Sequence, residues 1–162
     1  MINDPVSNFL DEIPVYGSLM GLDFGTKTIG IAVSDTGQTI ATGIKTIRRT
    51  KFQRDLQNLK FMIENRQIKG IVFGLPRNMN GTEGPRCQST RTFARNVSLS
   101  IKIPITFWDE RLSTVVAERS LIEANASRQR RNKVIDYVAA SFILQGALDR
   151  LAVLRKGSTF GK

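Results

Sequence analysis

The feature that most constrains this chain is one carboxylate inside an apolar segment that otherwise predicts a buried strand. Residues 18–25 are mainly apolar, contain Asp23, and lead into a Gly-Thr-Lys turn. A segment rich in Val and Ile, 29–34, follows at once and predicts a hairpin. An ionised group inside a sheet is costly unless a metal ion or a paired cation compensates it. Asp23 is therefore a candidate functional residue, and the alternative is that it begins the turn early and is solvated.

The composition predicts one globular domain with a polyanionic partner. The 162 residues are enough for one substantial core. No stretch approaches the ~20 consecutive apolar residues of a membrane span. The 24 Lys and Arg residues against 14 Asp and Glu leave a formal net charge of +10. Such an excess favours nucleic acid as the partner, and a generally basic globular protein is the alternative.

Two residue types are informative because they are rare. The chain has no histidine, which excludes His-based general catalysis, Ser-His triads and His-ligated zinc. Its single cysteine, Cys87, cannot form an internal disulfide and fits a reducing cytoplasm. The N-terminus carries acid where an export signal would carry Lys or Arg. Only oxygen ligands remain for metal chemistry, and these suit Mg²⁺ or Mn²⁺.

Apolar periodicity predicts an α/β domain with the element order β-β-β-α-β-α-β-α-α. The expected strands are 18–25, 29–35, 39–47, 70–74 and 103–108. The expected helices are 51–66, 84–99, 113–125 and 133–151. Helical crossovers then add the last two strands to a meander of three.

The chain is expected to have three parts. Residues 1–17 contain two prolines and no clear period, which predicts an extension ahead of the domain. Its apolar side chains, Phe9 among them, could still dock onto the body. The domain is expected over 18–152, with 153–162 as a C-terminal tail.

Acidic residues fall where such a fold could bring them together. Asp23 is on the first strand, which we expect to be central. Asp109 and Glu110 follow the last strand, at the end where open α/β sheets bind ligands. Asp136 precedes an apolar stripe that begins at Ala140, so we expect it to face the sheet. Clustered carboxylates repel unless a divalent cation shares them. A strand-end turn and an acid that complements the helix dipole are the alternatives.

Cations near these acids are candidates for phosphate contacts. Lys27 lies in the hairpin turn, where glycine and threonine hydroxyls could also meet a phosphate. Arg77 lies in the loop after the fourth strand. A basic segment between the last two helices contributes Arg128, Arg130, Arg131 and Lys133. A plain turn and a solvated interhelical loop are the alternatives. We expect Trp108 and Cys87 to pack in the core.

At this point the chain resembles a known family. The segments that carry the resemblance are 22–35, 72–76, 80–84, 109–114 and 136–140. In this order they are similar to the YqgF/RuvX family, pre-16S rRNA nucleases with an RNase H-like, Holliday-junction-resolvase-like fold. The resemblance spans about 18–152 and implies a five-stranded mixed sheet. It also implies a Mg²⁺- or Mn²⁺-dependent endonuclease site formed by Asp23, Glu110 and Asp136, with Asp109 as a helper.

The resemblance implies hydrolysis of phosphodiester bonds in structured nucleic acid. Processing of the 5′ end of precursor 16S rRNA, a step of ribosome biogenesis, is the favoured role. A Holliday-junction-type DNA resolvase, a non-catalytic nucleic-acid-binding module and a small ATPase-like protein are the alternatives. The protein is expected in the cytoplasm as a monomer or homodimer. One departure is 78–80, where many relatives have an acid beside Gly81; it leaves the three core acids intact.

Overall fold

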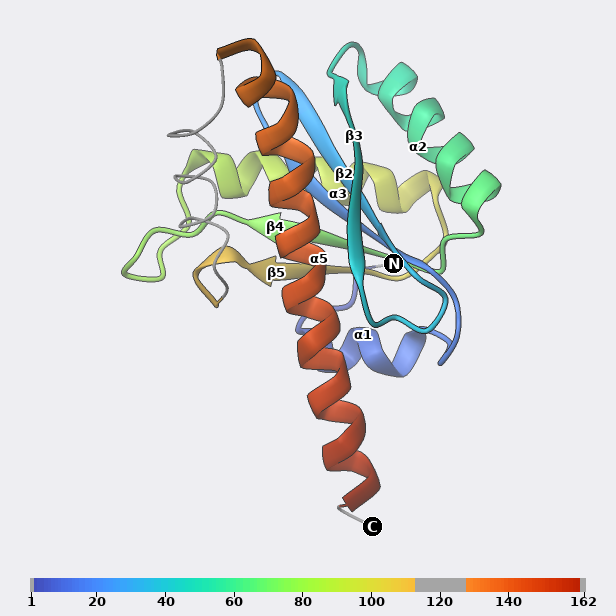
Figure 1. Ribbon diagram of the computed structural model, residues 1–162. Coiled ribbons are helices and arrows are strands. Elements are labelled where there is room, and N and C mark those ends of the chain that lie inside the picture. Colours follow the sequence, from blue (N-terminus) through green and yellow to red (C-terminus); the bar gives the residue numbers. More distant parts are fainter. Residues whose placement is uncertain (1, 113–127, 161–162) are drawn as a thin grey trace.

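One five-stranded mixed sheet organises the fold (Figure 1). The computed structural model describes residues 2–112 and 128–160, with side chains described in 2–112 and 137–157. The strands are β1 (Leu19–Phe24), β2 (Thr28–Ser34), β3 (Ala41–Arg48), β4 (Gly70–Leu75) and β5 (Ile105–Asp109). The helices are α1 (Val6–Glu12), α2 (Phe52–Arg66), α3 (Pro85–Ser100), the 3-10 turn η1 (Glu110–Leu112) and α5 (Arg128–Phe160). The predicted strands are confirmed, as are the helices expected at 51–66 and 84–99, which are α2 and α3. The helix expected at 113–125 lies outside the described residues.

The strand order places β1 in the middle of the sheet. The order is β3-β2-β1-β4-β5, with β1, β2 and β3 antiparallel in a meander. The strands β4 and β5 run parallel to β1 and to each other. The expected α/β fold with a mixed sheet is therefore confirmed, and the C-terminal ends of β1, β4 and β5 meet at one edge.

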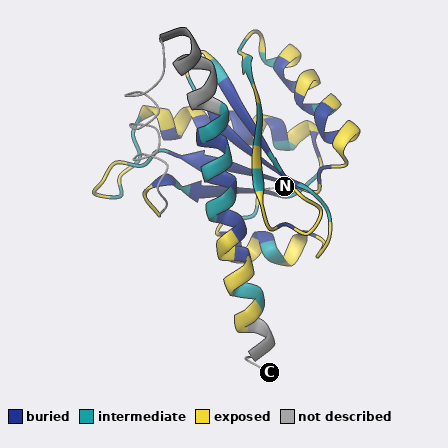
Figure 2. Ribbon diagram, in the orientation of Figure 1, coloured by how far each residue is buried: buried dark blue, intermediate teal, exposed yellow. Residues whose placement is uncertain are grey.

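Two hydrophobic cores lie on opposite faces of the sheet. In β1 alternate side chains enter different cores, since successive residues of a strand point to opposite faces. Met20 and Leu22 pack in the core that α2 and α3 cover. Leu19 packs in the other core, against the apolar stripe of α5. Figure 2 shows the turns of α5 that cross the sheet as buried or intermediate, and the described turns on their C-terminal side as mainly exposed.

Helix α5 begins earlier and ends later than predicted. The segment 128–133, expected as a loop between helices, is helical. Arg, Gln and Lys are good helix formers, and no Gly or Pro interrupts this segment. The helix also continues past 151 to Phe160, through most of the expected tail.

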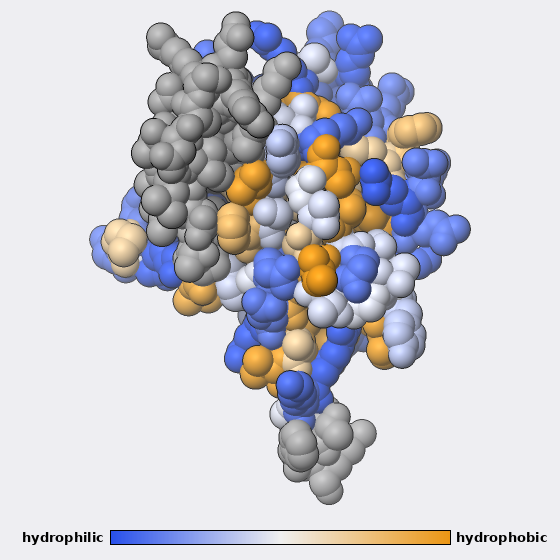
Figure 3. All heavy atoms as spheres, in the orientation of Figure 1, coloured by the Kyte–Doolittle hydropathy of each residue, from blue (hydrophilic) through white to orange (hydrophobic). Residues whose placement is uncertain are grey.

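The apolar composition of α5 reflects its packing on the sheet. Its segment Tyr137–Gly157 is long and apolar enough to cross a membrane, by length and composition alone. Ala140, Ile143 and Leu144 in that segment are fully buried. On the face shown in Figure 3, exposed apolar residues are interspersed with hydrophilic ones. A helix that forms a protein core meets the same composition test, and the burial of this stripe accounts for it.

The N-terminal extension docks on the body. Phe9 of α1 is fully buried, and Ile13 is 8% exposed. Ahead of α1, the Asn3 amide donates to the Ile105 carbonyl at 2.6 Å, beside a parallel bridge between Ile2 and Ile105. The possibility that Phe9 docks is confirmed.

Glycines allow α5 to lie close to the sheet. A Cβ atom on Gly21 would lie 2.6 Å from Leu144 Cβ and 3.0 Å from the Ala140 carbonyl oxygen. Real Cβ atoms do not approach other atoms so closely, so the helix would have to shift. Gly21 therefore sets the distance between β1 and α5.

Gly21→Ala should lower the free energy of unfolding by about 1–3 kcal/mol, because overpacking forces α5 off β1. Gly157→Ala is the matched control: a Cβ there meets nothing within 4 Å, and alanine stabilises a helix relative to glycine by about 0.5–1 kcal/mol. Chemical denaturation of both variants measures the difference. Equal stabilities would mean that the β1–α5 contact is looser than described.

Candidate metal centre

Three acids are buried among the described side chains: Asp23, Asp55 and Glu110. Asp55 has a structural role, because it accepts hydrogen bonds from the Thr50 amide at 3.1 Å and the Thr50 hydroxyl at 3.0 Å at the start of α2. Asp23 and Glu110 instead lie at the sheet edge where β1, β4 and β5 end. These two are the candidates for chemistry.

Asp23 faces α5. It lies two residues after Gly21, whose missing Cβ points at α5, and alternate residues of a strand share a face. The parallel register pairs Leu22 with Phe73, so the next position of β1 lies beside Gly74. The Asp23 side chain is only 6% exposed.

Glu110 reaches the same face from η1. A Cβ atom on Gly74 would lie 3.4 Å from the carboxyl carbon of Glu110 and would collide with Ile143 of α5. The carboxyl group of Glu110 therefore lies over Gly74, next to the position of Asp23, and Glu110 is 3% exposed. The structure brings these two carboxylates to one face of neighbouring strands, beneath α5.

The third predicted acid is placed only by its backbone. Asp136 lies in α5 four residues before Ala140, and the Ala140 carbonyl approaches Gly21 of β1. Its side chain lies outside the described ones, as do those of Arg128, Arg130, Arg131 and Lys133. Among side chains in 2–112 and 137–157, no three His, Cys, Asp or Glu residues form a group that could hold a metal ion. A three-carboxylate site therefore requires Asp136 and stays a prediction.

The donor set fits a hard divalent cation. Asp23 and Glu110 offer carboxylate oxygens, the ligands that Mg²⁺ and Mn²⁺ prefer. The absent side chain of Gly74 lets Ile143 of α5 and the Glu110 carboxyl pack directly over β4. Burial of both acids limits competition from solvent for the ligand oxygens.

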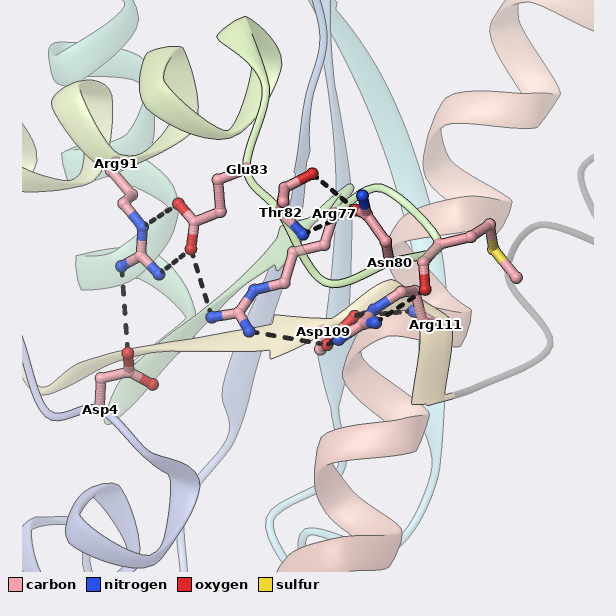
Figure 4. Close-up of polar contacts among 9 residues, drawn as sticks. Asp4, Arg77, Asn80, Thr82, Glu83, Arg91, Asp109 and Arg111 are labelled. Atoms are coloured by element: carbon pink, nitrogen blue, oxygen red, sulfur yellow. Dashed lines mark hydrogen bonds and ion pairs between the residues drawn. The ribbon is translucent and has the colours of Figure 1, made fainter.

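Asp109, the neighbour of Glu110, contacts arginines. The Arg111 guanidinium lies 2.6 Å from Asp109 Oδ2, and the Arg111 amide donates to Oδ1 at 3.0 Å (Figure 4). The side-chain hydrogen bond from Arg111 lowers the pKa of Asp109, and the charges of Arg111 and Arg77 act in the same direction. Asp109 thus caps the η1 turn that carries Glu110.

Arg77 is engaged by two acids. Its guanidinium lies 3.3 Å from Glu83 Oε2 and 3.9 Å from Asp109 Oδ2. Glu83 also accepts two hydrogen bonds of 2.7 Å from Arg91. These hydrogen bonds are the main reason that the pKa of Glu83 is lowered. Figure 4 shows these side chains extending from Arg91 to Arg111 along the strand ends. The predicted role of Arg77 in nucleic-acid binding is untested, and the ion pairs offset much of its charge.

The remaining sequence predictions concern Lys27, Trp108 and Cys87. Lys27 is exposed in the β1–β2 turn, so it is accessible to a ligand, and its role stays a prediction. Trp108 and Cys87 are buried as expected, and burial raises the pKa of the Cys87 thiol.

Sequence reasoning missed Arg49. Its guanidinium carbon lies 4.2 Å from the centre of the Phe24 ring, and Nη1 donates to the carbonyls of Gly25 at 2.8 Å and Thr26 at 3.1 Å. The antiparallel pairing of β2 and β3 places the end of β3 beside the turn after Asp23. The sequence could have indicated this contact, because an antiparallel pair formed by the second and third expected strands brings an Arg at the end of the third strand back to the turn after Asp23.

Comparison with known proteins identifies similar sequences over nearly the whole chain. The family model described as "RuvX: Holliday junction resolvase" matches residues 17–150. A protein of Roseobacter denitrificans named "Putative pre-16S rRNA nuclease" is 59% identical over 157 residues, 96% of each chain. A Rhodobacter capsulatus protein of the same name is 60% identical over 154 residues, 95% of this chain and 97% of that one.

A solved structure shares the fold. RuvC of Thermus thermophilus, in complex with a Holliday junction substrate, aligns with a TM-score of 0.51 at 10% identity. The alignment covers 82% of this chain and 94% of that one. The five-stranded mixed sheet is thus RNase H-like, as expected.

The arginine pairs of Asp109 and Glu83 should make stability depend on pH. Their pKa values lie below the ordinary 3.8 and 4.5 in the folded state. The stabilisation is therefore present above those values and lost as pH falls through the folded-state pKa values. We expect the free energy of unfolding to fall below about pH 4.5. The double variant Asp109→Asn, Glu83→Gln should flatten this fall, measured by denaturation between pH 7 and 3. An unchanged slope would contradict the ion-pair assignment.

Proposed function

This chain belongs to the RuvX family of nucleases, and we propose that it hydrolyses phosphodiester bonds at a metal site formed by Asp23, Glu110 and Asp136. The observation that carries the proposal is the position of the Glu110 carboxyl over Gly74, beside Asp23 and beneath α5. Both acids are buried at the edge where β1, β4 and β5 end. The third ligand, Asp136, is the part of the proposal that rests on family resemblance and on its helix position.

The residues of the chain supply the ligands and their alignment. Asp23 is held by the central strand and Glu110 by η1, which Asp109 caps. Two rigid supports fix the carboxylates relative to one another before a ligand arrives. A pair of Mg²⁺ or Mn²⁺ ions would supply water activation and stabilisation of the leaving oxygen.

Precursor 16S rRNA is the substrate we favour, with cleavage at its 5′ end and a cytoplasmic site of action. The support is the name shared by curated relatives that are 59–60% identical over almost the full chain. The formal charge of +10 suits a long polyanion. Lys27 and Arg77, together with Arg128, Arg130, Arg131 and Lys133, are proposed to position phosphates. Arg77 would exchange its contact with Glu83 or Asp109 for a phosphate.

A four-way DNA junction is the second candidate. The description of the matching family and the fold shared with RuvC support it. A junction presents two equivalent strands for cleavage, so a resolvase needs two active sites and hence a homodimer. A monomeric enzyme that cleaves precursor rRNA would favour the first candidate.

Asp23→Asn and Glu110→Gln should each abolish Mg²⁺- or Mn²⁺-dependent cleavage of precursor 16S rRNA, because each removes a metal ligand. The loss should exceed the ~10–100-fold cost of removing an outer-shell partner. Nucleic-acid binding in EDTA should survive, as the basic residues are retained. Incubation with labelled precursor rRNA and a labelled four-way junction measures cleavage in Mg²⁺ or Mn²⁺ and binding in EDTA.

Glu64→Gln is the control, since Glu64 is an exposed acid on α2. It should cleave at the wild-type rate, and thermal melts should show that all three variants fold. If Glu110→Gln cleaves as fast as the control, the proposed site is wrong. If the wild-type protein binds both substrates and cleaves neither, the protein is a binding module.

A further inference from the structure

A groove lies on the face of the sheet that α2 and α3 cover, opposite the face of Asp23, and reaches the turn after β1. Two adjoining cavities of about 170 and 450 Å³ form it. Phe24, Arg49 and Ser89 line both cavities. The smaller cavity is also lined by Gly25 and Thr26, which follow Asp23 in the chain by two and three residues. We call this feature the α3 groove.

Aromatic rings line the groove. Phe24 and Phe93 are stacked with centroids 4.3 Å apart, and Phe52 meets Phe93 edge-on at 5.6 Å. Phe24 and Phe93 are each 6% exposed, so they form the buried apolar floor of the groove. These buried rings support the side chains above them, including Arg49, which contacts Phe24 directly.

Arg49 presents a fixed planar cation above these rings. Its guanidinium lies against Phe24 at 4.2 Å, and two backbone carbonyls, those of Gly25 and Thr26, hold its Nη1. A guanidinium fixed in this way can stack on a base and neutralise a phosphate.

The α3 wall of the groove is neutral and polar. Its exposed side chains are Gln88, Ser89, Thr92 and Asn96, which can donate and accept hydrogen bonds. Arg86 adds a positive charge at the smaller cavity. Among the described residues that line either cavity there is no carboxylate. The wall therefore suits an anionic chain with bases that carry hydrogen-bonding edges.

We propose that the α3 groove binds an unpaired segment of the nucleic acid next to the phosphodiester bond that is cleaved. This choice of ligand rests on the proposed function. The groove includes Gly25 and Thr26 of the turn after Asp23, so a nucleic-acid strand that leaves the metal centre can pass around this turn into it. One base stacks against Arg49 in the larger cavity, whose volume is within the range of small-ligand sites, and the wall of α3 meets the edges of the bases.

An unpaired segment fits the groove better than a duplex does. The aromatic floor of the groove is recessed. Nucleobases in a double helix are stacked on each other and cannot reach it. A duplex would contact the basic surface through its phosphates alone. The α3 groove thus supplies a preference for single strands beside a site that acts on structured nucleic acid.

Thr92→Glu tests the groove, because it places a negative charge on the wall of the larger cavity. The probes are a fluorescent octauridylate and a blunt RNA duplex, with binding measured by anisotropy in EDTA. Asn58→Glu is the matched control: the same charge change at an exposed position in the middle of α2, away from both cavities. We expect Thr92→Glu to weaken octauridylate binding about tenfold relative to Asn58→Glu. Duplex binding should change equally in the two variants.

Arg49→Lys tests the stacking step, because it keeps the charge and removes the plane. It should also weaken octauridylate binding while leaving duplex binding close to that of the wild type, provided that thermal melts show a folded protein. Equal octauridylate binding by Thr92→Glu and Asn58→Glu would overturn the proposal. So would a loss of duplex affinity in Thr92→Glu as large as the loss for octauridylate.

The experiment separates this inference from the proposed function, since binding in EDTA does not depend on cleavage. If the wild type cleaves rRNA and Thr92→Glu binds octauridylate as Asn58→Glu does, the groove is refuted and the nuclease stands. If Thr92→Glu selectively loses octauridylate binding while the wild type cleaves nothing, the groove is supported as a single-strand site and the cleavage mechanism fails.

Discussion

The close approach of α5 to the sheet is the constraint on which the rest of the structure depends. Glycines of β1, β3, β4 and α5 remove the side chains that would hold helix and sheet apart, at Gly21, Gly43, Gly74 and Gly146. Gly74 serves the fold and the site at once. Without a Cβ it admits Ile143 of the helix, and the Glu110 carboxyl lies next to the same position.

The acids at this sheet edge are in two electrostatic environments. Asp109 and Glu83 are held by arginines, which keep both groups ionised. The same contacts fix the loop between β4 and α3 and the η1 turn. Asp23 and Glu110 are buried on the face toward α5, where oxygen ligands can serve a divalent cation. The arginine pairs stabilise the scaffold that positions the two buried acids.

The apolar pattern of the sequence predicted the strands, because the pattern of a short segment determines whether it can form a buried strand. Alternation and apolar runs identified the five strands, and the position of Glu110 after the last parallel strand placed it at the edge that Asp23 also reaches. The charge of 128–133 predicted a solvated loop, but Arg, Gln and Lys are good helix formers and the segment is helical. The contacts of Arg49 and Arg111 depend on distances between separate elements, and no spacing in the sequence fixes those. The side chain of Asp136 lies outside the described residues, so its prediction is untested.

The docked N-terminal segment has a consequence for assembly. The strand β5 is the outer strand of the sheet on the side of β4, and the hydrogen bond and bridge at Ile105 show that the chain's own residues 2 and 3 occupy part of its free edge. A neighbouring molecule cannot extend the sheet across this position by adding a strand, because the main-chain groups there are already used. Edge-to-edge polymerisation is blocked at this point by a short piece of the protein's own backbone.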